Sequence, residues 1–86
     1  MEHAHPAARA EVKTSELTLR ALTAWLEIFR AREAFSLAQM NVASRRQILE
    51  FIDEREKLGG SSKSDVLRVR ARLADALAVE VAAKNR

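Results

Sequence analysis

The stretch Lys57–Asp65, which reads KLGGSSKSD, decides the fold and contains both glycines of the chain. Gly59 can adopt a left-handed backbone just past a helix end without the steric cost that other residues meet. Ser62 and Asp65 have the spacing of a variant capping box, in which a hydroxyl and a carboxylate accept hydrogen bonds from free N–H groups at a helix start. The stretch therefore predicts the end of one helix, a tight turn and the start of a second helix.

The sequence on either side of this turn favours long helices. No glycine or proline lies between Pro6 and Gly59, and alternation with a period of two residues does not persist anywhere. A turn this short brings the second helix back antiparallel to the first. The predicted fold class is therefore all-α, an antiparallel coiled-coil helical hairpin with a long first helix and a shorter second helix. The expected boundaries are a disordered tail at 1–8, a helix at about 9–58, a turn at 59–62 and a helix at about 63–86.

Apolar residues of the first helix repeat every three or four positions, which is the spacing of a helix–helix seam. One such series contains Leu19, Leu22, Leu26 and Phe29. A second series marks a similar seam with a polar layer inside it, and such a layer usually fixes the register of packed helices. Its members are Leu37, Asn41, Ser44, Ile48, Phe51 and Leu58.

The second helix carries two apolar faces. The larger side chains lie on one face and small ones on the adjacent face: Val66, Val69, Leu73, Leu77 and Val81, then Ala71, Ala74, Ala78 and Ala82. Two faces imply two helical neighbours, which one partner helix cannot supply. We therefore expect the hairpin to assemble laterally with other helices.

The second helix is also too short to cover the first, which leaves the stripe around Trp25 without an intrachain partner. We expect the chain to self-associate, most simply as an antiparallel dimer. An alternative is that the first helix breaks near Asn41 and folds back as a three-helix bundle. The residues predicted to form the oligomer interface are Leu22, Trp25, Leu26, Phe29, Leu73, Leu77, Ala74 and Ala78.

Composition excludes several other classes of protein. The chain has 86 residues, of which 48% are hydrophobic and only 5% aromatic, and it has no cysteine. Its net charge of +3 comes from interleaved basic and acidic residues, which indicates a solvated helix surface and not a nucleic-acid site. No signal peptide, membrane span, nucleophile–base set or metal-ligand cluster is visible. We expect no catalytic residue, no cofactor, no metal site and no enzymatic activity.

The turn resembles the periplasmic tip of the TolC-type outer-membrane efflux proteins. Gly59 is followed after five residues by Asp65-Val66-Leu67, with Ala71 and Leu73 beyond. Upstream, the segment 24–33 (Ala-Trp-Leu-x2-Phe-Arg-Ala-Arg-Glu) is similar to the aromatic-rich segment of that family, and its distance to Gly59 is similar to that in the first repeat. The resemblance covers about residues 10–86 and lacks the β-barrel segments.

This resemblance implies a structural and docking element of an outer-membrane efflux or type I secretion channel, in the periplasm. Family members are trimers whose helices form an α-barrel and whose hairpin tips contact a periplasmic adaptor protein. The implied tip residues are Gly59, Gly60, Ser62 and Asp65, and in some members the position of Asp65 joins polar links that hold the tip shut. The sequence departs from the family at Gly60, where many members carry a leucine that contacts the adaptor. The alternative function is a stand-alone cytoplasmic coiled-coil module for protein interaction.

Overall fold

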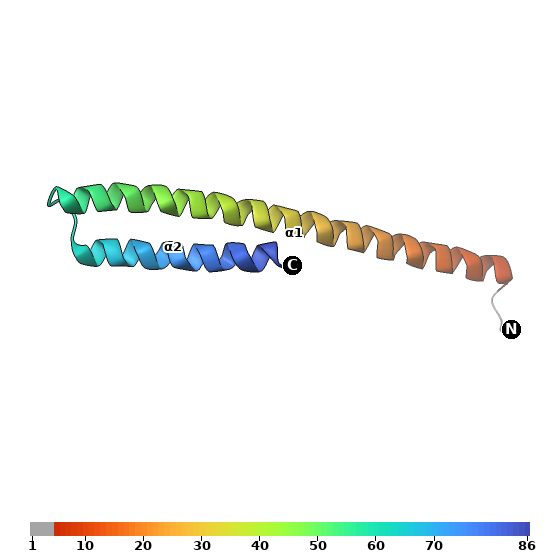
Figure 1. Ribbon diagram of the computed structural model, residues 1–86. Helices are drawn as coiled ribbons and strands as arrows, with labels where there is room; N and C mark the ends of the chain where they lie inside the picture. The colour runs from red at the N-terminus through yellow and green to blue at the C-terminus, as the bar shows by residue number, and fades with distance from the viewer. Residues whose placement is uncertain (1–4) are drawn as a thin grey trace. The chain divides into compact units, whose positions relative to one another are not determined.

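The computed structural model describes residues 5–86, which form two helices and no strand. Helix α1 runs from Pro6 to Lys57 and comprises 52 residues, and helix α2 runs from Lys63 to Lys84 and comprises 22. Figure 1 shows α2 returning antiparallel beside the C-terminal part of α1. The fold class predicted from the sequence, a helical hairpin with a long first and a shorter second helix, is confirmed. The chain divides into two units, Met1–Arg30 and Ala31–Arg86.

Helix α1 begins at Pro6, whereas a start near residue 9 was expected from the sequence. Proline suits the first helical position because its φ is preset and its missing N–H would have had no partner there. The Nδ1 atom of His5 accepts a hydrogen bond from the N–H of Ala7 at 3.2 Å, and the carbonyl of His5 accepts one from the N–H of Arg9 at 3.0 Å. His5 thus acts as the N-cap. The rest of the predicted tail, residues 1–4, lies outside the described residues.

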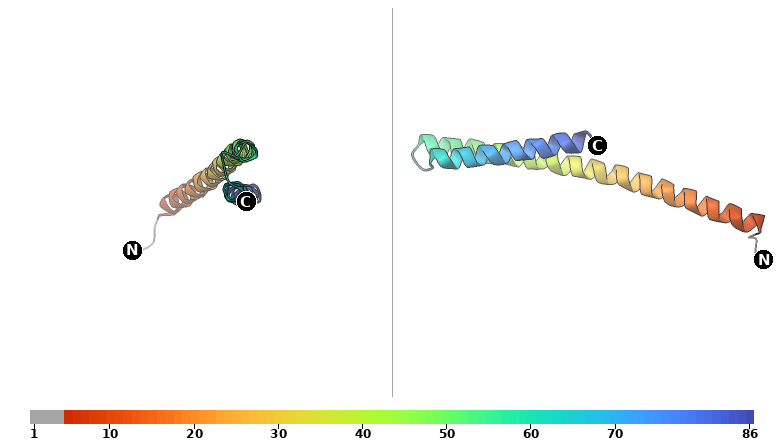
Figure 2. Two further views of the ribbon diagram at one scale, coloured as in Figure 1. Left: turned by 90° about the vertical axis from the view of Figure 1, so that its left-hand side faces the viewer. Right: turned by 90° about the horizontal axis from the view of Figure 1, so that it is seen from below.

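In the unit Ala31–Arg86, α2 packs against the C-terminal part of α1 along a single seam. The most buried side chains are small, with exposed fractions of 6% for Ala38, 5% for Val42, 8% for Val66 and 4% for Ala76. Small seam residues let two helix backbones approach closely. Figures 1 and 2 show the two helices side by side from perpendicular directions, up to the end of α2.

The α1 side of this seam repeats every four and three residues without interruption, as in a heptad pattern. Its half-buried and buried members are Ala31, Phe35, Ala38, Val42, Arg45, Leu49, Ile52 and Glu56. The seam predicted on this part of α1 from the sequence is therefore wrong. Its members Leu37, Asn41, Ser44, Ile48, Phe51 and Leu58 are all exposed. They lie about 100° around the helix from the seam that is used, since one helical residue turns the chain by that angle.

On α2, the predicted face is largely the one that packs. Val66 is buried and Val69, Leu73 and Leu77 are half-buried, whereas Val81 is exposed. Ala76, Glu80 and Ala83 complete the α2 side of the seam. Leu73 and Leu77, which the sequence analysis assigned to an oligomer interface, thus belong to the intrachain seam. The predicted small face, Ala71, Ala74, Ala78 and Ala82, is fully exposed.

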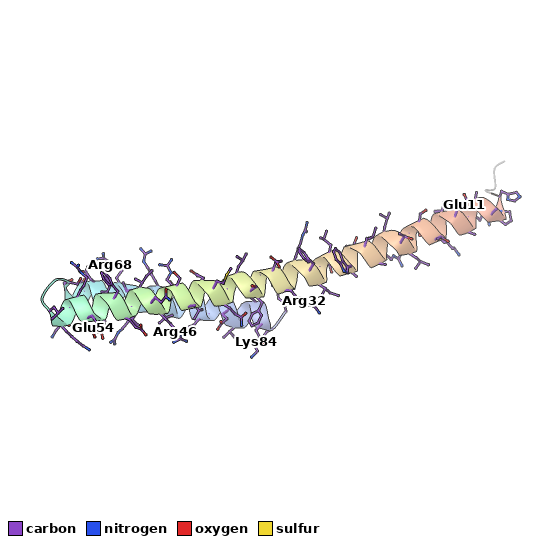
Figure 3. All side chains as sticks on the ribbon, turned by 90° about the horizontal axis from the view of Figure 1, so that it is seen from above. Glu11, Arg32, Arg46, Glu54, Arg68 and Lys84 are labelled. Carbon is purple, nitrogen blue, oxygen red and sulfur yellow. The ribbon has the colours of Figure 1, made fainter. Side chains whose placement is uncertain are left out.

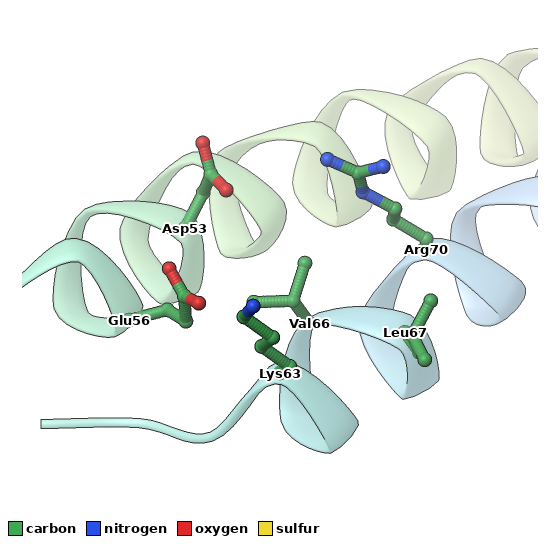
Figure 4. Close-up of a pocket in the computed structure, with 6 residues that line it drawn as sticks. All are labelled: Asp53, Glu56, Lys63, Val66, Leu67 and Arg70. Carbon is green, nitrogen blue, oxygen red and sulfur yellow. The ribbon is translucent and has the colours of Figure 1, made fainter. Parts of the chain in front are cut away.

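Residues of opposite charge lie on the two helices near the turn. The last turns of α1 are rich in acids, and the first turns of α2 are rich in bases. Figure 4 shows a pocket near the turn, with Asp53 and Glu56 on the α1 side, Lys63 and Arg70 on the α2 side, and Val66 pointing from α2 toward α1. The side chains of Arg46 and Lys84 extend outward from the helices (Figure 3). Opposite charges thus flank the seam where the helices meet.

The unit Met1–Arg30 contains the N-terminal part of α1. Every described residue of this unit is exposed. Helix α1 also continues through Asn41 without a break, so the alternative of a three-helix bundle is wrong. An apolar stretch of helix therefore lacks an intrachain cover in the part of the chain that the structure describes.

Candidate interaction surfaces

The turn between the helices is closed by a Schellman motif at the end of α1. The N–H of Gly60 donates to the carbonyl of Arg55 at 2.7 Å, and the N–H of Gly59 donates to the carbonyl of Glu56 at 3.0 Å. This 6→1 and 5→2 pair requires a left-handed residue at the position after the cap. Gly59 supplies it, with a φ of 82°. The turn predicted from the Gly-Gly pair is thus present, with the left-handed glycine in the expected place.

Arg55, in the last helical turn of α1, stabilises the connection between the two helices. Its guanidinium donates to the carbonyl of Gly60 at 3.1 Å and to the hydroxyl of Ser61 at 3.3 Å. The same guanidinium lies over the ring of Phe51, 5.6 Å from its centroid, which is within the range of a cation–π interaction. Arg55 is not among the tip residues predicted from the sequence. The indication in the sequence is an arginine with five-residue spacing to a Gly-Gly turn, since a long donor there can reach the turn carbonyls.

The capping box predicted at the start of α2 is present. The hydroxyl of Ser62 accepts from the N–H of Asp65 at 3.0 Å, and the carboxylate of Asp65 accepts from the N–H of Ser62 at 3.0 Å. The hydrogen bond from the backbone N–H of Ser62 lowers the pKa of the Asp65 carboxyl below its usual 3.8, and the Ser62 hydroxyl and the nearby positive charge of Arg68 act in the same direction. The carboxylate is therefore held ionised and engaged with the backbone of the turn.

The tip presents an apolar side chain that the sequence analysis had placed in a seam. Leu58, the residue directly before Gly59, is 85% exposed. Leu67 lies on α2 near the same end and is also exposed. Gly60 provides no such side chain, but Leu58, two residues earlier in the chain, is a leucine. The end of the hairpin thus combines a rigid, hydrogen-bonded turn with exposed leucines beside it.

Each helix of the hairpin carries a second apolar face outside the intrachain seam. On α1 it consists of the exposed series that includes Leu37, Ile48 and Phe51, with the polar Asn41 and Ser44 between them. On α2 it follows a heptad spacing through Leu67, Ala71, Ala74, Ala78 and Val81, all exposed, and lies about 150° around the helix from the seam. The pattern is typical of helices that have a neighbour on each of two sides.

The remaining predicted interface residues lie in the unit Met1–Arg30. Leu22, Trp25, Leu26 and Phe29 are all exposed, and Leu26 is the least so at 39%. The rings of Trp25 and Phe29 stack on each other, with centroids 5.7 Å apart and an interplanar angle of 15°. This stack stiffens one side of the stripe and leaves its apolar surface open to a partner.

Other kinds of site are not evident in the described part of the chain. Residues 5–86 contain no helix that is both long enough and apolar enough to cross a membrane. The same residues contain no group of three or more side chains placed to ligate a metal ion. Comparison of the chain with protein-family models, with curated proteins and with solved structures finds no match.

Proposed function

We propose that the chain is a structural and docking element of an outer-membrane efflux or type I secretion channel, as its resemblance to the TolC-type proteins suggests. In this role the hairpin forms part of a periplasmic α-barrel, and its tip meets a periplasmic adaptor protein. The observation that carries the proposal is the second apolar face on each hairpin helix. A helix inside a closed ring of helices needs a neighbour on both sides, whereas a lone hairpin needs only one.

The tip supports the docking part of the proposal. A binding surface that must hold its shape benefits from preorganisation, because less conformational entropy is lost on binding. The Schellman motif, the Arg55 contacts and the capping box order the backbone of residues 55–65 before any partner arrives. Leu58, exposed beside this ordered turn, would then replace the leucine that many family members carry at the position of Gly60.

Asp65 has two roles to reconcile under this proposal. Its Oδ2 atom caps α2 by accepting from the N–H of Ser62. Its ionised state, favoured by Ser62 and Arg68, leaves a negative charge at the tip. A polar link to a neighbouring subunit would have to add to the capping bond and not replace it, because loss of the cap weakens the start of α2.

The proposal is tested by the compartment that the tip occupies in the cells that make the protein. The chain has no cysteine, so a single introduced thiol reports its own surroundings. Ser64→Cys places a thiol at an exposed position of the tip, and Val42→Cys places one in the buried seam as a control. After the outer membrane alone is permeabilised, a maleimide that cannot cross the inner membrane should label the Ser64→Cys protein and spare the Val42→Cys protein.

The opposite result favours the alternative function. Labelling of Ser64→Cys only after the inner membrane is lysed would place the hairpin in the cytoplasm. The chain would then be a cytoplasmic coiled-coil interaction module. Recovery of the labelled protein with the outer-membrane fraction, as an oligomer, is the further result that the channel proposal requires.

A further inference from the structure

One apolar face of the unit Met1–Arg30 has no cover and a regular spacing. We name it the N-terminal face, and its members are Val12, Leu19, Leu22, Leu26 and Phe29. They occupy the a and d positions of successive heptads, with Ser15 in the remaining place. At the rise of an α-helix the face is about 26 Å long.

A helix whose apolar face is exposed to water has low stability. Isolated helices are marginal in water, and most helical stability in proteins comes from packing of an apolar face. All five members of the N-terminal face are at least 39% exposed. A helix that matches this length and spacing is therefore needed to cover it.

The geometry points to a second copy of the same chain, bound antiparallel through the same face. The positions of the face are symmetric about the point between Arg20 and Ala21. When two copies are reversed about that point, every a position meets a d position, as antiparallel coiled coils require. The resulting layers pair Val12 with Phe29, Ser15 with Leu26, and Leu19 with Leu22 of the second copy.

Side-chain size favours this orientation over a parallel one. In the antiparallel layers, the small Val12 and Ser15 lie opposite the larger Phe29 and Leu26. In a parallel pair each residue would meet itself, so that two Phe29 rings would crowd one layer and two Ser15 hydroxyls would leave another underfilled. Well-packed cores pair large side chains with small ones across facing positions.

The flanking charges favour the same orientation within the face. A parallel pair would bring Glu11 of one copy beside Glu16 of the other. The antiparallel pair places Glu16 beside Thr23, and Thr18 beside Trp25. Charged residues meet only at the ends, where Arg9 flanks Arg30 and Glu11 flanks Arg32 of the second copy, so that one repulsive and one attractive pair offset each other. The inference rests on this face alone and stands apart from the proposed channel function.

The first test is the mass of the full chain by sedimentation equilibrium at micromolar concentration. A dimer is expected. Leu22→Lys should weaken the dimer at least tenfold, because the substituted side chain buries a charge against Leu19 of the second copy. A monomer at all concentrations, with the chain still folded, would overturn the inference.

The second test reads the orientation by disulfide formation. In the antiparallel register, a Val12→Cys chain cannot cross-link to itself, because the two thiols lie at opposite ends of the face. Mixed Val12→Cys and Phe29→Cys chains should instead form cross-linked heterodimers under mild oxidation. Lys13→Cys mixed with Ile28→Cys is the matched control. These exposed positions are related by the same reversal as Val12 and Phe29, but they lie off the N-terminal face.

Two results of the cross-linking experiment would contradict the antiparallel pair. Self-cross-linking of Val12→Cys alone would show a parallel pair and refute the proposed register. Cross-linking of the control mixture as efficiently as the test mixture would show that collision, and not a defined interface, brings the thiols together. Both of these results count against the antiparallel second copy.

Discussion

Gly59 and Gly60 are adjacent but differ in what they require of the backbone. At Gly59, where φ is 82°, an added Cβ would meet no atom within 4 Å, so the cost of substitution comes from the backbone conformation. At Gly60 an added Cβ would lie 3.4 Å from the Nη2 atom of Arg55, the end of a flexible side chain. We predict that Gly59→Val destabilises the hairpin by about 1–3 kcal/mol, because a β-branched residue is strained at positive φ.

Gly60→Ala is the matched comparison for that variant. It should leave the melting temperature nearly unchanged, since the guanidinium of Arg55 can shift by a few tenths of an ångström. Thermal unfolding followed by circular dichroism compares the two. Equal melting temperatures for wild type and Gly59→Val would show that the left-handed backbone is not retained in solution.

The capping carboxylate of Asp65 predicts a dependence of stability on pH. Its pKa in the folded state is lowered below 3.8, so the ionised form stabilises the fold above that pH. This contribution is lost as the pH falls through the folded-state pKa. The stability difference between wild type and Asp65→Asn should therefore be constant at neutral and weakly acidic pH, and should shrink below pH 3.8.

Urea unfolding at a series of pH values measures this difference. Asp75→Asn, which removes a carboxylate elsewhere on the exposed surface of α2, is the control for the general effect of charge. A wild-type advantage that persists at the lowest pH would mean that the ionised carboxylate is not the source of the stabilisation.

The turn could be predicted from the sequence because its hydrogen bonds are local. Contacts that depend on how side chains fold back in the structure could not be predicted in this way. Gly59, Ser62 and Asp65 satisfy backbone groups within a few residues, so their roles follow from spacing alone. The role of Arg55 depends on how its side chain folds back over the turn, which spacing does not specify. The N-cap role of His5 was missed for a similar reason, because histidine is not among the usual capping residues.

Helix α1 shows why one apolar series was mistaken for another. Periodicity reveals that a helix has an apolar face, but α1 has two within the hairpin, and both repeat every three or four residues. Both series contain large apolar side chains, such as Leu37 and Phe51 in the exposed series and Phe35 in the packed one, so side-chain size did not distinguish them. The series that packs against α2 includes Ala31 and Ala38, whose small side chains contribute little to a hydrophobic pattern but permit close approach. Which face is used depends on α2, and so is not a property of α1 alone.

This close approach predicts a contrast between two alanines of α2. Ala76 is 4% exposed and lies in the seam, whereas Ala78 is exposed on the second face. Ala76→Leu should destabilise the hairpin by about 1–3 kcal/mol, since added methylenes in a packed seam force the helices apart. Ala78→Leu should be nearly neutral in the monomer because leucine is also a good helix former. Chemical denaturation of both variants decides the matter, and equal effects would contradict the seam described.

Taken as one polypeptide, the chain should be unevenly protected from solvent exchange. Residues of the unit Met1–Arg30 have no intrachain cover in the described structure, whereas the hairpin has a buried seam. At concentrations where the chain is monomeric, amides of residues 6–30 should exchange with deuterium faster than those of residues 35–56. Raising the concentration should slow exchange at 12–29 if a second copy binds there. Uniform exchange along α1 at low concentration would show that the helix is equally stable throughout.

The turn also has a consequence for the rate at which the chain folds. Its hydrogen bonds join residues within Glu54–Val66, so little loop entropy is lost when they form. Proteins whose contacts are local fold quickly, and we expect the hairpin to nucleate at the turn and zip toward the end of α2. Ser62→Ala should then slow refolding and leave the unfolding rate nearly unchanged in stopped-flow measurements, whereas a change confined to unfolding would place the nucleus elsewhere. During synthesis, the hairpin would accordingly close only after α2 begins to emerge from the ribosome. Until then α1 would have no second helix of the hairpin to pack against.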